Sequence, residues 1–60
     1  MEKEITVDFF ALGFVTARFK VEWYVPIDKV LFDYFREIIA RKNSAIKNLD
    51  EVEILSYKIN

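Results

Sequence analysis

The sequence contains no cysteine and no histidine, and only one glycine and one proline among its 60 residues. Without cysteine the chain has neither disulfides nor a thiolate, and without histidine it has no imidazole relay and no zinc site of the Cys/His kind. A single glycine cannot build a glycine-rich phosphate loop. We therefore expect a protein that holds no metal and no cofactor.

An excess of charge of one sign is also absent, because nine Lys and Arg stand against ten Asp and Glu, for a net charge of −1. Such a balance gives no field that attracts nucleic acid or anionic lipid. The opening Met1-Glu2-Lys3-Glu4 is unlike a signal peptide, and the longest uncharged stretch, residues 9–17, is too short to cross a bilayer. These features predict a cytoplasmic protein without a membrane partner.

Apolar residues are abundant, at 53% of the chain, and aromatic residues make up 17%. This composition is that of a packed protein, not of a disordered segment. A chain of this length buries only about 60% of its unfolded surface and cannot supply a second core. We expect one compact domain over residues 1–60.

Two segments, residues 4–9 and residues 15–25, alternate between apolar and polar side chains as half-buried strands do. Gly13 lies between them and predicts the turn of a hairpin. A register that pairs Ile5 with Lys20 would place a charge in the apolar face. Pairing Ile5 with Phe19 keeps the face apolar and requires a three-residue loop, a type I turn followed by Gly13 at positive φ in a G1 bulge.

A helix follows Pro26, with Asp28 as its N-cap. The pattern predicts that it ends at Asn43-Ser44 or continues to about Asn48. Its apolar residues have helical spacing and are expected in the core: Val30, Leu31, Tyr34, Phe35, Ile38 and Ile39.

Residues 51–59 predict a third strand whose apolar pattern changes phase. Val52 and Ile54 share one face, whereas alternate residues from Leu55 onward share the other. Either a bulge near Ile54-Leu55 switches the phase or both faces of the strand are covered.

The order of these elements predicts an α+β fold, β-β-α-β, with a three-stranded antiparallel sheet in the order 2-1-3 and one helix packed on one face. The first strand is then central, and the sheet face opposite the helix is open. The helix is expected to cover Ile5, Val7, Phe9, Phe19, Val21 and Trp23.

Carboxylate pairs are the only conceivable catalytic groups. Glu51 with Glu53, or Asp33 with Glu37, could act as a general acid and base or hold Mg²⁺. Solvated sides of an edge strand and of a helix explain both pairs more simply. We therefore predict no catalytic residues and a protein that is not an enzyme.

The open face of the sheet offers a second possibility, because single-stranded nucleic acids stack on exposed aromatic residues beside cations. The face is expected to carry Phe10, Phe14 and Tyr24 together with Arg18 and Lys20. Three acidic residues share it and cancel the positive field, so nucleic acid is an unlikely partner.

The packing of a hydrophobic core does not explain the apolar residues at the end of the hairpin. Phe10 faces Phe14 in the predicted register, and Leu12 occupies the turn, where polar residues are usual. Either the connection around Ile46 and Leu49 folds over these side chains, or they form an interaction surface. That surface would be larger if the third strand had no bulge, because Leu55 and Tyr57 would then lie on the same side of the sheet. The predicted partner-binding residues are Phe10, Leu12 and Phe14, followed by Arg18 and Tyr24.

The β-β-α-β plan resembles that of small phage-encoded proteins that bind and inhibit host enzymes, a likeness of element order without a shared motif. It implies an inhibitor or modulator of a larger protein. The sequence thus predicts a small protein-binding module. A homodimeric structural protein is the first alternative, and a single-stranded nucleic-acid binder is the second.

Overall fold

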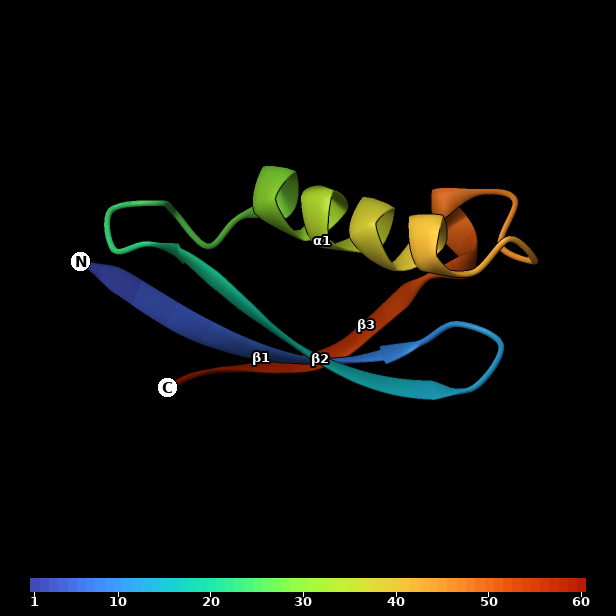
Figure 1. Ribbon diagram of the computed structural model, residues 1–60, viewed down its shortest axis with the longest axis horizontal. Helices are drawn as coiled ribbons and strands as arrows, with labels where there is room; N and C mark the ends of the chain where they lie inside the picture. Colours follow the sequence, from blue (N-terminus) through green and yellow to red (C-terminus); the bar gives the residue numbers. More distant parts are fainter.

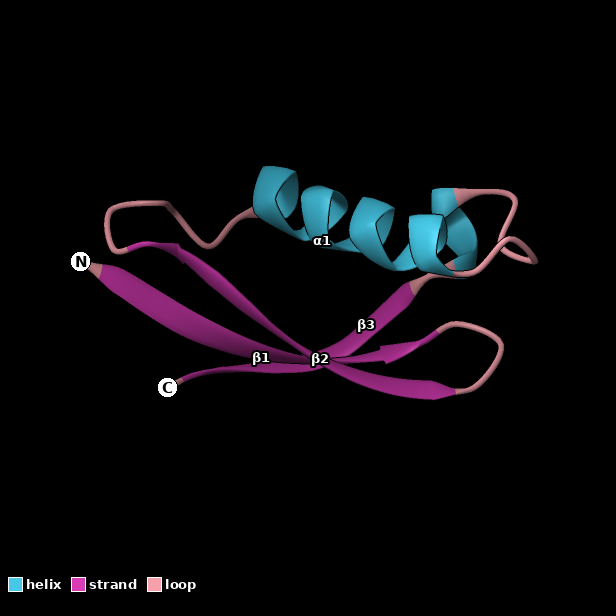
Figure 2. Ribbon diagram, viewed as in Figure 1, coloured by secondary structure: helices cyan, strands magenta, loops and turns pink.

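The computed structural model describes all 60 residues as a helix lying on one face of a sheet (Figures 1 and 2). The elements are β1 (Glu2–Phe10), β2 (Phe14–Glu22), α1 (Lys29–Lys42), a short 3₁₀ helix η1 (Leu49–Glu51) and β3 (Glu53–Ile59). Both ladders are antiparallel and the strand order is β2-β1-β3. The predicted α+β fold is confirmed, with β1 in the centre.

The hairpin register is the one predicted by keeping the apolar residues of both strands on the same face of the sheet. Ile5 lies opposite Phe19, and Phe10 lies opposite Phe14. The turn itself differs from the prediction: Leu12 has a φ of 62° and Gly13 a φ of 150°. A type I turn has negative φ at both central residues, so the predicted type I turn with a G1 bulge is wrong, although Gly13 does have a positive φ.

Helix α1 begins where the sequence predicts, since the backbone N–H of Leu31 donates to Asp28 Oδ1 at 3.1 Å. It ends at Lys42 with Asn43 as its C-cap and does not continue to Asn48. The expected buried stripe is too wide, because Val30 is 78% exposed and Tyr34 57% exposed. The buried side of the helix is narrower and consists of three residues with four-residue spacing: Leu31, Phe35 and Ile39.

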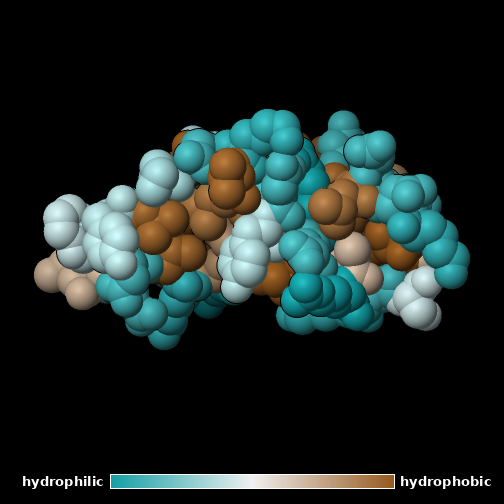
Figure 3. Space-filling model, turned by 90° about the horizontal axis from the view of Figure 1, so that it is seen from above, coloured by the Kyte–Doolittle hydropathy of each residue, from teal (hydrophilic) through white to brown (hydrophobic).

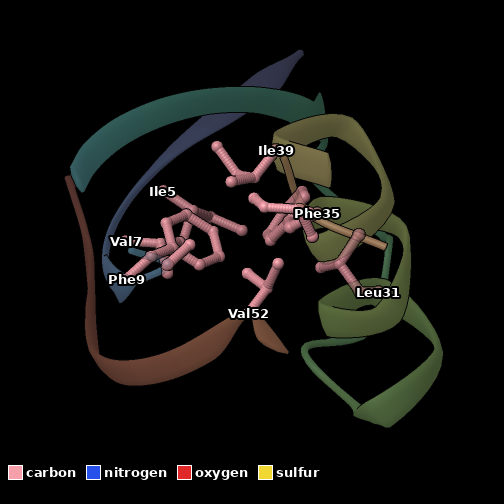
Figure 4. Packing of buried hydrophobic residues seen from close by; sticks show 9 residues of the cluster. Ile5, Val7, Phe9, Leu31, Phe35, Ile39 and Val52 are labelled. Carbon is pink, nitrogen blue, oxygen red and sulfur yellow. The ribbon is translucent and has the colours of Figure 1, made fainter. Parts of the chain in front are cut away.

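The core lies between α1 and the central strand (Figure 4). Phe35 stacks on Phe19 with ring centroids 4.0 Å apart. Strand β2 contributes no fully buried residue, because α1 lies nearer to β3 than to β2. The nine buried residues are Ile5, Val7, Phe9, Ala11, Leu31, Phe35, Ile39, Ile46 and Val52.

Strand β3 carries a bulge, which decides between the two readings of its sequence. Asp8 pairs with Ser56 and Phe9 with Ile54, so Leu55 is the additional residue. The phase therefore switches, and Tyr57 lies on the helix side, where its ring centroid is 5.2 Å from that of Phe32. The open face consequently gains no apolar extension from Tyr57.

The end of β2 also corrects the sequence interpretation. The strand stops at Glu22, and Trp23 is 62% exposed rather than covered by the helix. Pro26 cannot continue a ladder, so the chain turns before it. The Lys3 ammonium donates to the carbonyls of Trp23 at 3.1 Å and Val25 at 2.6 Å and thereby holds this turn. No helix has the length and apolar character needed to span a membrane.

Candidate protein-binding surface at the hairpin end

The loop between β1 and β2 forms one end of the molecule (Figure 1). Three large apolar side chains, here called the hairpin tip, are exposed there: Phe10 by 42%, Leu12 by 63% and Phe14 by 82%. The phenyl rings of Phe10 and Phe14 meet edge to face, with centroids 5.1 Å apart. The tip is therefore a paired aromatic surface and not three separate side chains.

The backbone positions this pair. Phe10 and Phe14 are the last cross-strand pair of the β1–β2 ladder, so both side chains project to the same face of the sheet. An edge-to-face aromatic pair contributes about 0.5–1.5 kcal/mol beyond its buried area. This largely solvated pair belongs at the low end, about 0.5 kcal/mol, which restricts the two rings relative to each other but adds little to the stability of the fold. The tip is held in place even though solvent surrounds it.

The connection from α1 to β3 does not cover the tip. Ile46 and Ala11 are both buried members of the core, so this part of the chain packs on the helix side. Leu12 and Phe14 stay well exposed, and Phe10 lines a shallow groove that also includes Leu49. The alternative in which the connection around Ile46 and Leu49 buries the hairpin end is therefore wrong for Leu12 and Phe14. It applies only in part to Phe10.

The size of the tip can be compared with that of known interaction patches. With about 200 Å² for a fully exposed phenyl side chain, Phe10 and Phe14 together expose roughly 250 Å². Leu12 raises the total to about 350 Å², which falls among the largest apolar patches of ordinary monomers, and these are often functional.

Arg18 and Tyr24 do not join the tip. Arg18 lies opposite Thr6 in the middle of the open face, four residues along β2 from Phe14, or about 13 Å at the usual rise of a strand. Tyr24 lies in the turn that follows the end of β2, at the opposite end of the 35 Å long molecule. Its ring packs edge to face on Trp23, with centroids 6.0 Å apart.

The middle of the open face is a hydrogen-bonded polar surface. Asp8 on the central strand accepts from Thr16 Oγ1 at 2.8 Å on one side and from Ser56 Oγ at 3.1 Å on the other. Asn60 donates to the side chains of Glu4 and Thr6. These groups satisfy one another, so the tip stands out as the apolar end of a polar face.

Three of the four carboxylates considered for catalysis, Asp33, Glu37 and Glu51, have structural partners. Asp33 accepts from Lys29 at 2.7 Å and from Arg36 at 2.6 Å, and the hydrogen bond from Lys29 is the main reason that its pKa lies below the ordinary range. Glu37 pairs with Arg41. No group of three acidic side chains is placed to hold a metal ion.

Glu51 has a role that the sequence interpretation missed. Its carboxylate accepts from the backbone N–H of Asn48 at 2.8 Å and of Lys47 at 2.6 Å, and these bonds hold its pKa below the ordinary range. The signal was present, because Asn48 and Glu51 have the three-residue spacing of a capping box.

A second surface, also missed, runs between α1 and β3. It is a shallow, mostly apolar groove that includes Phe32, Ile54, Leu55 and Tyr57. No sequence signal could have found it, because it depends on where the helix lies over the sheet. Seen from the helix side, the hydrophobic surface is divided by hydrophilic side chains (Figure 3).

Together these features define a small α+β protein with a mixed polar sheet face and an apolar hairpin tip. Comparison with protein-family models, with curated proteins and with solved structures finds no match.

Proposed function

We propose that this chain is a non-enzymatic protein-binding module that inserts its hairpin tip into an apolar pocket of a larger protein and so inhibits or modulates it. The observation that carries the proposal is the exposed, edge-to-face pair of Phe10 and Phe14 beside the exposed Leu12. Aromatic side chains that fill a partner's pocket supply most of the binding energy in many interfaces.

The charges around the tip favour a protein over a nucleic acid. Glu53 lies directly opposite Phe10 on β3, and Asp8 precedes Phe10 by two residues on the same face. Bases that stack on aromatic residues bring phosphates close to them, and these carboxylates would repel phosphates. Leu12 has no ring on which a base could stack.

The test compares two exposed aromatic residues at different places. Phe14→Ser removes a ring of the tip, and Tyr34→Ser removes an exposed ring of α1 as the matched control. Both variants should melt within a few degrees of the wild type, because a solvated side chain contributes little to stability. In quantitative affinity capture, Phe14→Ser should lose a partner that Tyr34→Ser retains.

The captured protein is then purified and titrated calorimetrically against each variant. Phe10→Ser should weaken its binding as Phe14→Ser does, by at least about tenfold, as expected for a central aromatic residue. Equal affinity of wild type and Phe14→Ser would contradict the proposal. So would a sharp fall in the melting temperature of Phe14→Ser, since it would mean that the ring belongs to the core.

A further inference from the structure

The sheet has two unpaired edges, and they differ. Because β1 is central, one side of β2 and one side of β3 have no neighbouring strand. The edge of β3 is interrupted by the bulge at Leu55, a device that discourages pairing with another chain. Strand β2 is regular over nine residues and contains neither a bulge nor a proline. Its edge is the one open to a further strand.

The phase of the ladder shows which residues of β2 face that edge. At its two ends, Ala11 N–H donates to the carbonyl of Gly13 at 2.9 Å and Trp23 N–H donates to that of Met1 at 3.0 Å. Hydrogen-bonded positions alternate along an antiparallel pair, so the odd-numbered residues of β2 bond to β1. The even-numbered residues direct their N–H and C=O groups to the free edge: Phe14, Thr16, Arg18, Lys20 and Glu22.

We propose that a second copy of this chain pairs antiparallel with this edge, about a twofold axis at Ala17. Charge selects the register, because both chains present Arg18 and Lys20 on the same face. An axis at Arg18 places this residue opposite its own copy. An axis at Phe19 places Arg18 opposite Lys20. Both arrangements set like charges against each other, which is destabilising.

Among the registers that avoid such contacts, the axis at Ala17 pairs the most residues of β2, seven from each copy. Thr16 then lies opposite Arg18 of the second copy, and Phe14 opposite its Lys20, where the ammonium can lie against the phenyl ring. These are the even-numbered residues that direct their backbone groups outward, so each pair exchanges two backbone hydrogen bonds.

The helix side of β2 supports the same pairing. Val15, Ala17 and Phe19 are apolar but none is fully buried, because α1 lies nearer to β3. In the proposed dimer Val15 meets Phe19 of the second copy and Ala17 meets its own copy. The result is a continuous sheet of six strands in the order β3-β1-β2-β2-β1-β3 with both helices on one face.

The interface is small. Seven residues of each strand pair, and we estimate a total buried area of roughly 1,000 Å², at the low end of specific interfaces. A reversible dimer that forms at micromolar to millimolar concentration is therefore expected. Phe14 belongs to both the hairpin tip and this interface, whereas Phe10 lies on β1 and Arg18 lies outside the tip. Phe10→Ser therefore tests the function proposed for the tip without changing the dimer, and the substitutions at Thr16 and Arg18 test the dimer without changing the tip, so the two proposals can fail independently.

The test uses two hydroxyl residues that flank Asp8 in the same way. Thr16→Arg places the new arginine of each copy opposite Arg18 of the other copy. Within one chain the new side chain faces Asp8, so we expect the fold to be retained. Ser56→Arg makes the equivalent change beside Asp8 on the β3 edge and is the matched control. Circular dichroism verifies that both variants are folded.

Sedimentation equilibrium from about 10 μM to 1 mM measures the mass against that of the 7.2 kDa monomer. We expect a dimer for the wild type and for Ser56→Arg, and at least about tenfold weaker association for Thr16→Arg. The double variant Thr16→Arg/Arg18→Glu should restore the dimer, because opposite charges then face each other. A monomeric wild type at about 1 mM, equal weakening by both arginine substitutions, or no recovery in the double variant would overturn the proposal.

Discussion

Leu12 at the hairpin tip offers a direct test of how the turn is built. Its φ of 62° lies in the left-handed region, which costs a residue with a Cβ atom about 1–2 kcal/mol. Leu12→Gly removes this strain, while the greater freedom of glycine in the unfolded chain opposes the gain by about 0.5–1 kcal/mol. The free energy of unfolding should therefore rise by about 0.5 kcal/mol, since the exposed Leu12 side chain adds little to the core.

Thermal unfolding followed by circular dichroism measures this change. In so small a domain 1 kcal/mol corresponds to about 4–8 °C, so Leu12→Gly should melt about 2–4 °C above the wild type. Leu12→Ala is the control, because it removes most of the side chain and keeps the Cβ atom that causes the strain. The alanine variant should melt close to the wild type.

A glycine variant that melts at or below the alanine variant would refute the reasoning. Strain at Leu12 would then be absent or relieved by movement of the loop. The proposed function adds a second expectation, that both variants bind the captured partner more weakly than the wild type. Greater stability together with weaker binding would separate what residue 12 does for the fold from what it does for recognition.

Three further predictions concern the body of the fold. Phe35→Ala should cost about 3–5 kcal/mol and leave the domain largely unfolded by circular dichroism, because the ring is fully buried; a folded variant would contradict this. Asp28→Ala should cost about 1 kcal/mol in urea unfolding through loss of the helix cap, and Lys29→Ala should have almost no effect. The pKa values of Asp33 and Glu51 are lowered, so the stability they provide is present at neutral pH and is lost as the pH falls through these lowered pKa values. Glu51→Gln should therefore reduce the loss of unfolding free energy as the pH falls below about 4. If the unfolding free energy of the variant fell with acid as steeply as that of the wild type, this role would be contradicted.

The hairpin shows which parts of this fold the sequence determines. A slip of one residue would move every apolar side chain to the open face, so the alternation of apolar and polar residues alone predicts the pairing of Ile5 with Phe19. The same alternation requires a loop of three residues. It does not specify the φ of each loop residue, and the left-handed conformation at Leu12 therefore differs from the predicted turn.

The helix and the third strand show where periodicity stops being sufficient. Spacing identifies the apolar side of α1, but the width of the buried line depends on which strands lie beneath it, and Val30 and Tyr34 fall outside that line. In β3 the pattern reduced the possibilities to two, and only the pairing of Ile54 with Phe9 distinguishes them. Both outcomes depend on tertiary placement, which adjacent residues do not encode.

The candidate surface also contains residues whose placement the local sequence predicts and one, Tyr24, whose placement it does not predict. Phe10 and Phe14 are neighbours through the hairpin ladder, so local sequence predicts their contact. Alternation of apolar and polar residues continues past Glu22 and so predicts Tyr24 on the same face as these residues, whereas the strand ends at Glu22. Alternation reports which side chains are apolar, and the turn before Pro26 decides where the ladder ends.

The hairpin tip is the part of the molecule that the stability of the fold does not explain. A domain of this size is stable by only about 3–9 kcal/mol, so strain of about 1 kcal/mol at Leu12 is a substantial fraction of the total. Polar residues at positions 10 and 14 would keep the ladder, and glycine at position 12 would relieve the turn, without removing a fully buried side chain. The aromatic pair and the strained leucine therefore contribute little that the core requires. Exposed apolar groups held in a fixed geometry are what a partner's pocket would recognise, and this is the physical basis of the function proposed for the tip.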